Sequence, residues 1–455
     1  MRIATIGLCD PGYSEDVARE YHAQAVTQLR KSVSDIVDVG LQTQEETAPK
    51  AVHTLLQQHV ENPFDALFLV QVAWSRPAVL LQVVRAFPNV PMVLYSPGSD
   101  IENGVIKSIA PAAGIGSTVP ILRRHHIKFR YVWSTPGKPI KEAEFMPFLH
   151  AARASRKLSG SKLGMIGFGD MRLQATGFDV QEVHETFGVE VESIDMLELQ
   201  KAMDALKDNE VSKQVKTLTA KWSYIDDKLH DEVLRKAVAA YMVLDQWAEQ
   251  RGYIGLSIKC PTGVTVNMGF TPCLVGCLLA RKYHYVCEND IPGLLGQVIL
   301  GLLSEKISTY WELYEVLEDG VLLGCCGYCP EDLLSEPMRI RIVEGFMPGL
   351  ACCSRVKTGP YTLARLGKGL DGRYLFNFTE GDAVEPPAWY EHACGSVQHP
   401  SVRFIPKIPI ERFLRNVLAQ HFAVIPGHWG DTLDEFAKIK NIINPLVDKT
   451  IQYKS

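Results

Sequence analysis

The 455-residue sequence lacks the long basic runs that a nucleic-acid-binding surface requires. Its 47 Lys and Arg residues are outnumbered by 52 Asp and Glu residues, so the formal net charge is −5. Binding to a phosphate backbone depends on clustered positive charge. Nucleic acid is therefore not expected as a partner.

Long apolar runs and an N-terminal signal are also missing. The longest nearly uninterrupted apolar stretches, 268–280 and 291–303, are shorter than the roughly 20 residues that a membrane-spanning helix needs. The chain opens with a strand-like run from residue 3, without the charged and apolar regions of a signal peptide. We therefore expect a cytoplasmic protein with no membrane partner.

The eleven cysteines lack the dense spacing of small secreted proteins held together by disulfides. Reduced thiols are expected, most of them in the core. Cys326, Cys329, Cys352 and Cys353 offer four thiolates to a structural zinc ion. Buried free thiols are the favoured interpretation, because two adjacent cysteines span a tetrahedral site awkwardly and the surrounding sequence is apolar. Both interpretations stay open at this point.

Short runs of β-branched residues alternate with helical patterns through the first two thirds of the chain. The predicted strands lie at 3–8, 36–39, 66–72, 90–95, 129–133, 162–167, 189–194 and 253–259. The predicted helices lie at 14–31, 48–59, 111–125, 148–157, 212–218 and 231–250. This alternation is typical of parallel, doubly wound sheets.

The pattern changes after residue 317, where glycines, prolines and short alternating runs predict a mostly β region that ends in a helix at 431–440. The predicted fold class is therefore α/β, with two doubly wound Rossmann-like domains followed by a β-rich C-terminal domain. The predicted boundaries are 1–140 for the N-terminal domain, 141–317 for the central domain and 318–455 for the C-terminal domain.

An acidic cluster, Cys287-Glu288-Asn289-Asp290, follows an apolar strand-like run and precedes a helix that opens with Pro and Gly. Open α/β sheets bind ligands at the carboxyl ends of their strands, so Glu288 and Asp290 are expected to face a cleft. In the alternative interpretation the two carboxylates cap the following helix, which stabilises it by up to ~1 kcal/mol.

This region resembles the active site of the L-fucose/L-arabinose isomerase family. The similar segments are the strand ending at Lys259-Cys260, Pro272-Cys273, the acidic cluster, the turn at Gly324 to Gly327, the segment with Thr362 and Arg365, and His421 followed by Gly430-Asp431. The resemblance is strong after residue 250, and the order of three domains agrees as well.

The resemblance implies an aldose–ketose isomerase acting on a small sugar or modified sugar. Such enzymes use a divalent cation, commonly manganese (Mn2+), because a Lewis acid stabilises the charge that develops when a proton leaves the carbon beside a carbonyl. The residues implied are Glu288, Asp290 and His421 as metal ligands, Glu288 and Asp290 as catalytic carboxylates, and Lys259, Asn289, Thr362 and Arg365 as contacts to the sugar.

Two positions depart from the family's pattern. The family's glutamate after the Lys-Cys strand is replaced by Thr262-Gly263, and no Asp or Glu occurs between Gly252 and Cys287. Cys325 stands where related members carry a histidine, and a thiolate there would favour zinc or another softer ion.

These departures leave three hypotheses open: Glu288 has taken over the missing role, the site binds metal weakly or differently, or the fold catalyses another reaction on a sugar-like ligand. The competing class is a sugar-binding or assembly protein that has lost isomerase chemistry. Arg123, Arg124 and Lys128 suggest an acidic group on the ligand, and a solvated helix end is the ordinary alternative.

The resemblance further implies a homo-oligomer, because family active sites are completed by the N-terminal domain of a neighbouring subunit. Light scattering on the purified protein is expected to give a multiple of the monomer mass. A monomer across the working concentration range would contradict this prediction.

Overall fold

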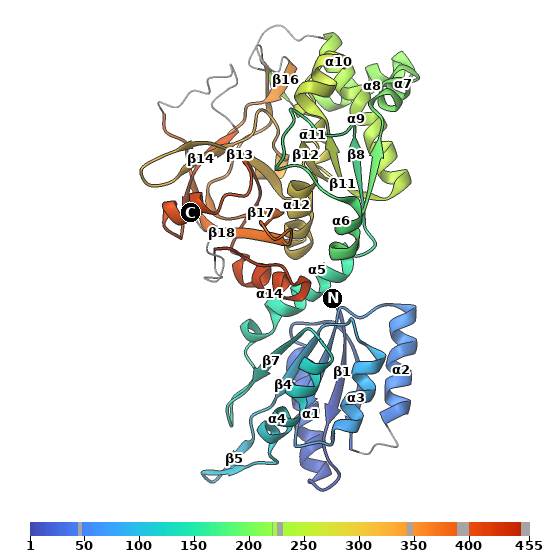
Figure 1. Cartoon of the computed structure of the whole chain (residues 1–455), viewed down its shortest axis with the longest axis vertical. Coiled ribbons are helices and arrows are strands. Elements are labelled where there is room, and N and C mark those ends of the chain that lie inside the picture. The colour runs from blue at the N-terminus through green and yellow to red at the C-terminus, as the bar shows by residue number, and fades with distance from the viewer. Residues whose placement is uncertain (44–47, 221, 225–230, 344–348, 389–399, 447–455) are drawn as a thin grey trace. The chain divides into compact units, whose positions relative to one another are not determined.

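The computed structural model describes residues 1–43, 48–220, 222–224, 231–343, 349–388 and 400–446 (Figure 1). The chain divides into two compact units, Met1–Arg156 and Lys157–Ser455. The three-domain division at residues 140 and 317 stays a prediction.

The first unit contains a five-stranded parallel sheet with the order β2-β1-β3-β4-β7, which is a common order of doubly wound sheets. Its strands are β1 (Arg2–Leu8), β2 (Asp35–Gln42), β3 (Ala66–Gln71), β4 (Met92–Ser96) and β7 (Phe129–Trp133). Its helices are α1 (Glu15–Leu29), α2 (Ala48–Glu61), α3 (Pro77–Ala86), α4 (Pro111–Arg124), the 3-10 turn η1 (Glu142–Glu144) and α5 (Met146–Leu158), which runs into the second unit.

Helices cover both faces of this sheet. Alternate residues of a strand point to opposite sides, so each strand contributes side chains to the packing on both faces. Ala4, Ile6 and Leu8 of β1 share one core with α2, α3 and α4. Gly7 faces the other side, where an added Cβ would lie 2.6 Å from the ring of His22 in α1. Burial on both faces explains why β3 is buried at every position.

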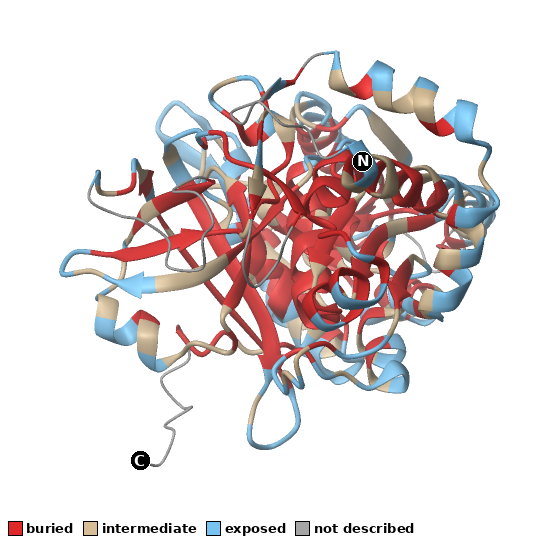
Figure 2. Ribbon diagram, turned by 90° about the horizontal axis from the view of Figure 1, so that it is seen from above, coloured by how far each residue is buried: buried red, intermediate tan, exposed pale blue. Residues whose placement is uncertain are grey.

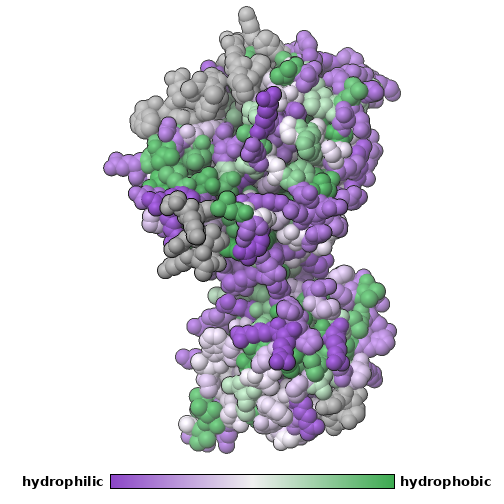
Figure 3. Space-filling model, viewed as in Figure 1, coloured by the Kyte–Doolittle hydropathy of each residue, from purple (hydrophilic) through white to green (hydrophobic). Residues whose placement is uncertain are grey.

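A short hairpin, β5 (Asp100–Glu102) and β6 (Val105–Lys107), projects from the first unit. Its Ile101, Val105 and Ile106 side chains are exposed and account for the hydrophobic area at the lower left of Figure 3. Exposed apolar patches often contact other proteins. The homo-oligomer stays a prediction.

The second unit contains a four-stranded parallel sheet with the order β12-β11-β8-β9. Its strands are β8 (Lys162–Ile166), β9 (Glu190–Ile194), β11 (Tyr253–Ile258) and β12 (His284–Cys287). The helical elements of this part are α6 (Val180–Phe187), α7 (Met196–Asp204), α8 (Asp208–Thr219), α9 (Asp231–Arg251), the π-helical η2 (Cys260–Thr265), α10 (Val266–Met268), α11 (Cys273–Leu279) and α12 (Ile291–Ser304).

A closed antiparallel barrel follows, with the order β13-β14-β19-β18-β17-β20. Its strands are β13 (Thr309–Val316), β14 (Val321–Gly324), β17 (Gly359–Lys368), β18 (Tyr374–Val384), β19 (Ser401–Pro406) and β20 (His421–Pro426). The remaining elements are β10 (Ser223–Tyr224), β15 (Arg339–Val343) and β16 (Gly349–Cys352), which form a small sheet, together with η3 (Glu331–Leu333), α13 (Ile410–Arg415) and α14 (Gly430–Lys440).

Helix α12 connects the parallel sheet to the barrel, since it packs against β11 and β12 on one side and β17 and β20 on the other. It is buried along nearly its whole length, and Figure 2 shows how buried residues fill the sheets and the central helices. Within the described residues no single helix has the length and apolarity of a membrane span. Cys260–Met268 and Cys273–Leu279 reach that composition only together, with a bend of 108° between them.

The structure confirms the predicted mixed α/β chain with parallel sheets and a β-rich C-terminal region. Closure of the C-terminal strands into a barrel was not predicted, because alternating runs in the sequence do not reveal whether the first and last strands pair. The number of Rossmann-like domains stays a prediction.

The tight packing of α12 is tested at Gly301, where an added Cβ would lie 2.2 Å from the ring of His284. Gly301→Ala is expected to destabilise the protein, because overpacking costs about 1–3 kcal/mol and outweighs the ~1 kcal/mol that alanine gains in helix propensity. Denaturant unfolding followed by circular dichroism measures the difference.

Gly296→Ala in the same helix is the control, since its Cβ would find its nearest neighbour, Ala423 Cβ, at 3.4 Å. This variant is expected to be as stable as the unsubstituted protein or more stable. Equal destabilisation by both changes would contradict the packing argument.

Candidate active site

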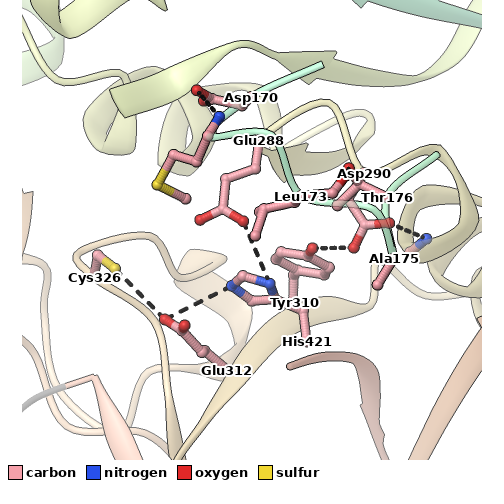
Figure 4. Close-up of polar contacts among 12 residues, drawn as sticks. Asp170, Leu173, Ala175, Thr176, Glu288, Asp290, Tyr310, Glu312, Cys326 and His421 are labelled. Atoms are coloured by element: carbon pink, nitrogen blue, oxygen red, sulfur yellow. Dashed lines mark hydrogen bonds and ion pairs between the residues drawn. The ribbon is translucent and has the colours of Figure 1, made fainter. Parts of the chain in front are cut away.

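Residues from the parallel sheet and from the barrel of the second unit converge on one buried cluster (Figure 4). The parallel sheet contributes Glu288 and Asp290, which follow β12, and the loop after β8 contributes Asp170. The barrel contributes Glu312 from β13 and His421 from β20, which are direct partners in the antiparallel ladder.

The backbone at Glu288 and Asn289 has φ values of 63° and 52°, in the left-handed region that non-glycine residues seldom adopt. Such strain persists where surrounding contacts hold it, and it is concentrated at functional sites. Here the Asn289 amide donates to the Ile166 carbonyl at 2.9 Å, which ties the end of β12 to the end of β8. Asn289, a predicted sugar contact, therefore supports the turn.

Glu288 and His421 face each other at the centre of the cluster. Glu288 Oε2 lies 3.6 Å from His421 Nδ1, and both atoms are buried without a hydrogen-bond partner. The other ring nitrogen, Nε2, lies 3.8 Å from Glu312 Oε2. The His421 ring also stacks on Tyr310, with 4.3 Å between ring centroids and an interplanar angle of 13°.

Burial controls the charges of this cluster. Burial, followed by the carboxyls of Glu312, Asp290 and Asp170, raises the pKa of Glu288 to about 9. Burial lowers the pKa of His421 to about 3. Near neutral pH both groups are therefore uncharged by themselves, and a bound cation would favour the ionised carboxylate of Glu288.

Asp290 has a different environment from Glu288. Its carboxylate accepts hydrogen bonds from the Gly293 backbone N–H at 2.9 Å and from the Tyr310 hydroxyl, and it pairs with the fully buried Arg365. Arg365 also donates to the Ala175 carbonyl at 2.9 Å. Although burial alone would raise the pKa of Asp290, Arg365 and Tyr310 hold it below its ordinary value. Asp290 is thus the N-cap of α12, as the alternative interpretation of the sequence has it.

The segment with the missing glutamate lies against Asp170. Asp170 is completely buried, and its Oδ1 accepts hydrogen bonds from the Thr262 backbone N–H at 3.1 Å and from the Thr262 hydroxyl. Its Oδ2 is buried without a hydrogen-bond partner. The Asp170 carboxylate, from the loop after β8, therefore lies beside Thr262, in the segment that lacks the family's glutamate.

The other predicted sugar contacts lie apart from each other. Lys259 follows β11 at the carboxyl edge of the sheet, and its side-chain stem covers Gly263 so closely that a Cβ there would lie 2.5 Å from Lys259 Cγ. Thr362 pairs with Ile425, four positions along β20 from His421, or about 13 Å at ~3.3 Å per residue. Its hydroxyl donates to the Gly427 carbonyl at 2.7 Å, so it stabilises a loop outside the cluster.

One group in the described part of the chain offers a metal ion three side chains: Cys287, Glu288 and His421, whose ligand atoms all lie within 4.8 Å of one another. Two of the three predicted ligands, Glu288 and His421, are in this group. The four cysteines considered for zinc form no disulfide in the structure, and the Cys277 thiol donates a hydrogen bond to the sulfur of Cys352.

Comparison with known proteins now adds to the geometry. Residues 340–444 match the family model described as L-fucose isomerase, C-terminal domain. The predicted resemblance to L-fucose isomerases is confirmed. The chain is also similar to proteins named sulfoquinovose isomerase from four organisms.

The relative from Alkalicoccus urumqiensis is 20% identical over 88% of this chain and 90% of its own length. The relative from Priestia aryabhattai is 20% identical over 81% and 82%, and that from Clostridium sp. (strain MSTE9) is 22% identical over 83% and 84%. Together with the L-fucose isomerase match, these similarities support an isomerase that acts on a sugar.

Sequence reasoning missed Glu312, Tyr310 and Asp170. Glu312 and Tyr310 lie on the same face of β13, which their spacing of two residues predicts once β13 is recognised as a strand. Asp170 lies in the loop after β8. No local pattern links these residues to the L-fucose isomerase motifs, because their partners come from distant segments.

The buried pair of Asp290 and Arg365 provides a stability test. Asp290→Asn and Arg365→Met are each expected to lower the free energy of unfolding by about 3–5 kcal/mol, because each leaves one buried group without its counter-charge. The double variant is expected to recover part of that loss, which a double-mutant cycle measures by denaturant unfolding.

Asp245→Asn is the control, since Asp245 pairs with Lys282 at 2.9 Å on the surface. Its expected cost is below about 1 kcal/mol. If the effects of the two single changes at Asp290 and Arg365 simply add in the double variant, the pair is not coupled as described.

Proposed function

We propose that this chain interconverts the aldose and ketose forms of a small sugar that carries an acidic group. The observation that carries the proposal is the buried, unpartnered pair of Glu288 Oε2 and His421 Nδ1 at the carboxyl edge of the parallel sheet. Such an edge is where open α/β sheets bind ligands. The similarity to isomerases of sulfonated and deoxy sugars supports the same reaction class.

The cluster fits a divalent cation. Two unpartnered buried atoms 3.6 Å apart are costly by themselves, and a cation between them would satisfy both. When bound, the cation supplies electrostatic stabilisation of the negative charge that develops on the sugar oxygens. Manganese, which the family resemblance implies, accepts the carboxylate and imidazole donors of this pair.

Glu288 is the proposed proton carrier. Its carboxylate takes the proton from the carbon beside the sugar carbonyl and returns it to the former carbonyl carbon. The hydroxyl proton of the first carbon passes to the former carbonyl oxygen, so that no net proton is gained or lost. The ionised carboxylate that a bound cation would favour suits this role, because a general base must accept the proton and then release it. The left-handed backbone at Glu288 holds the carboxylate in the cluster.

Asp290 and Glu312 are proposed to position this machinery. Asp290 holds Tyr310, and Tyr310 stacks on His421, so the ring has a fixed orientation on one face. Glu312 faces Nε2 of the same ring, and a carboxylate in that place orients an imidazole whose other nitrogen is a ligand. The ion pair of Asp290 and Arg365 keeps Tyr310, and through it the His421 ring, in place.

The acidic group is inferred from the relatives, whose printed name denotes a sulfonated hexose. Lys259 is the proposed contact, because this cationic side chain leaves the carboxyl end of β11, beside the loop that carries Asp170. A half-buried lysine ammonium is a suitable partner for a sulfonate because it is a compact positive charge with three hydrogen-bond donors.

The test is a screen of purified protein against neutral pentoses, neutral hexoses and sulfonated hexoses, with manganese or zinc added, in deuterated water. Proton NMR is expected to show aldose–ketose interconversion and deuterium at the carbon beside the carbonyl. Glu288→Gln is expected to lower turnover by about 10²–10⁴-fold, the usual contribution of general acid–base catalysis.

Glu315→Gln is the matched control, since Glu315 lies on β13 close to the cluster in sequence but its side chain is exposed. It is expected to retain full activity. Saturable sugar binding without turnover of any sugar would overturn the isomerase proposal in favour of the sugar-binding alternative.

A further inference from the structure

The donor atoms at the candidate cation site include a sulfur. Cys287 is the last residue of β12, and its Sγ lies within 4.8 Å of the nearest ligand atoms of Glu288 and His421. The set therefore offers one sulfur, one oxygen and one nitrogen. Resemblance to the family places Asp290, not Cys287, among the ligands.

Consecutive residues of a strand normally point to opposite faces, so Cys287 and Glu288 would not be expected to meet at one ion. They do so here because the chain leaves the strand at Glu288 with a φ of 63°. The Asn289 amide holds that turn by its bond to the Ile166 carbonyl. The strained backbone thus has a geometric consequence, which is the convergence of two adjacent side chains.

Asp290 is not available for the third position. Both of its oxygens are already engaged: Oδ1 accepts from the Gly293 N–H, and Oδ2 accepts from the Tyr310 hydroxyl and Arg365. An added Cβ at Gly293 would lie 2.6 Å from Asp290 Oδ2 and 2.8 Å from Arg365 Nη1, so this corner of the cluster has no spare volume. Release of Asp290 toward a cation would leave Arg365 buried without a counter-charge.

The separation of the oxygen and nitrogen atoms suits a tetrahedral ion. Zinc–nitrogen and zinc–oxygen bonds of about 2.0–2.2 Å and a zinc–sulfur bond of about 2.3 Å place neighbouring ligand atoms about 3.3–3.6 Å apart. Glu288 Oε2 and His421 Nδ1 are 3.6 Å apart. Three protein ligands leave a fourth position, as in catalytic zinc sites, where a water or substrate oxygen binds.

The chemical softness of the ligand atoms also favours a zinc-like ion. Thiolate ligands select zinc and other soft or intermediate ions, whereas manganese prefers carboxylate, carbonyl and water oxygens. We propose that Cys287 is the third ligand, with Glu288 and His421, and that the site takes a zinc-class ion in preference to manganese. The inference rests on the proposed function for the existence of a cation site, and it departs from the manganese that the resemblance implies.

Cobalt is the probe, because a thiolate bound to cobalt gives a sulfur-to-metal charge-transfer band in the near ultraviolet. The full-length protein, stripped of metal and kept reduced, is titrated with cobalt and then with zinc or manganese. We expect one cobalt per chain with a charge-transfer band, loss of that band on addition of zinc, and no loss with equimolar manganese.

The variant Cys287→Ser is expected to lose the charge-transfer band and to bind zinc at least about 10–100-fold more weakly, with little change in manganese affinity. Native mass spectrometry gives the metal stoichiometry independently, and circular dichroism checks that the variant is folded; Cys287→Ala provides a second variant. Cys9→Ser is the matched control, since Cys9 is a buried thiol of the first unit and its replacement should leave the spectrum unchanged.

Three results would overturn the proposal: no charge-transfer band in the unsubstituted protein, manganese bound as tightly as zinc, or a band that survives Cys287→Ser and disappears in Cys325→Ser. The last result would assign the sulfur to Cys325, which accepts the hydrogen bond of the Cys287 thiol. Sugar turnover supported by manganese in any of these cases would leave the isomerase function standing. Failure of that function is recognised separately, by the absence of turnover with every ion.

Discussion

The buried ion pair between Arg365 and Asp290 joins the barrel to the parallel sheet, and the geometry of the candidate site depends on it. Both side chains are completely inaccessible to solvent. Removal of two charges from water is unfavourable unless further hydrogen bonds satisfy them. Here the Gly293 N–H and the Tyr310 hydroxyl serve Asp290, and the Ala175 carbonyl serves Arg365. The pair therefore fixes the start of α12, the turn before it and the barrel strand beneath it as one structure.

Two carboxylates separated by one residue have different roles because of their surroundings. Asp290 has a cationic partner and stays ionised, whereas Glu288 has an imidazole, two further acidic neighbours and no cation. A cation between Glu288 and His421 would supply the missing positive charge, which is the physical reason to infer one. The charges around the two carboxylates thus distinguish Asp290, which has a structural role, from Glu288, which is placed for chemistry.

The segment that departs most from the family's pattern lies against a carboxylate from another loop. Thr262 occupies the region after β11 and contributes a hydroxyl and an N–H, both of which bind Asp170. The carboxylate beside this segment thus comes from the loop after β8, on the neighbouring strand of the sheet. Identity to the sulfoquinovose isomerases is 20–22% along most of the chain.

The sequence by itself determined the features that depend on neighbouring residues. Alternation of strand and helix patterns predicted the parallel sheets, and the strand-end position of Glu288 and Asp290 placed them at the carboxyl edge. Resemblance added His421. Only the tertiary structure placed Glu312 opposite His421, because that pairing joins strands more than 100 residues apart through closure of the barrel. It alone showed that Arg365, 75 residues from Asp290, occupies that carboxylate, and that Thr362 holds a distant loop. Periodicity in the sequence indicates which face of a helix or strand is buried. The partner that each buried polar group meets is decided by how distant elements pack. That packing therefore decides which residues can bind a ligand, which support them and which cap a helix.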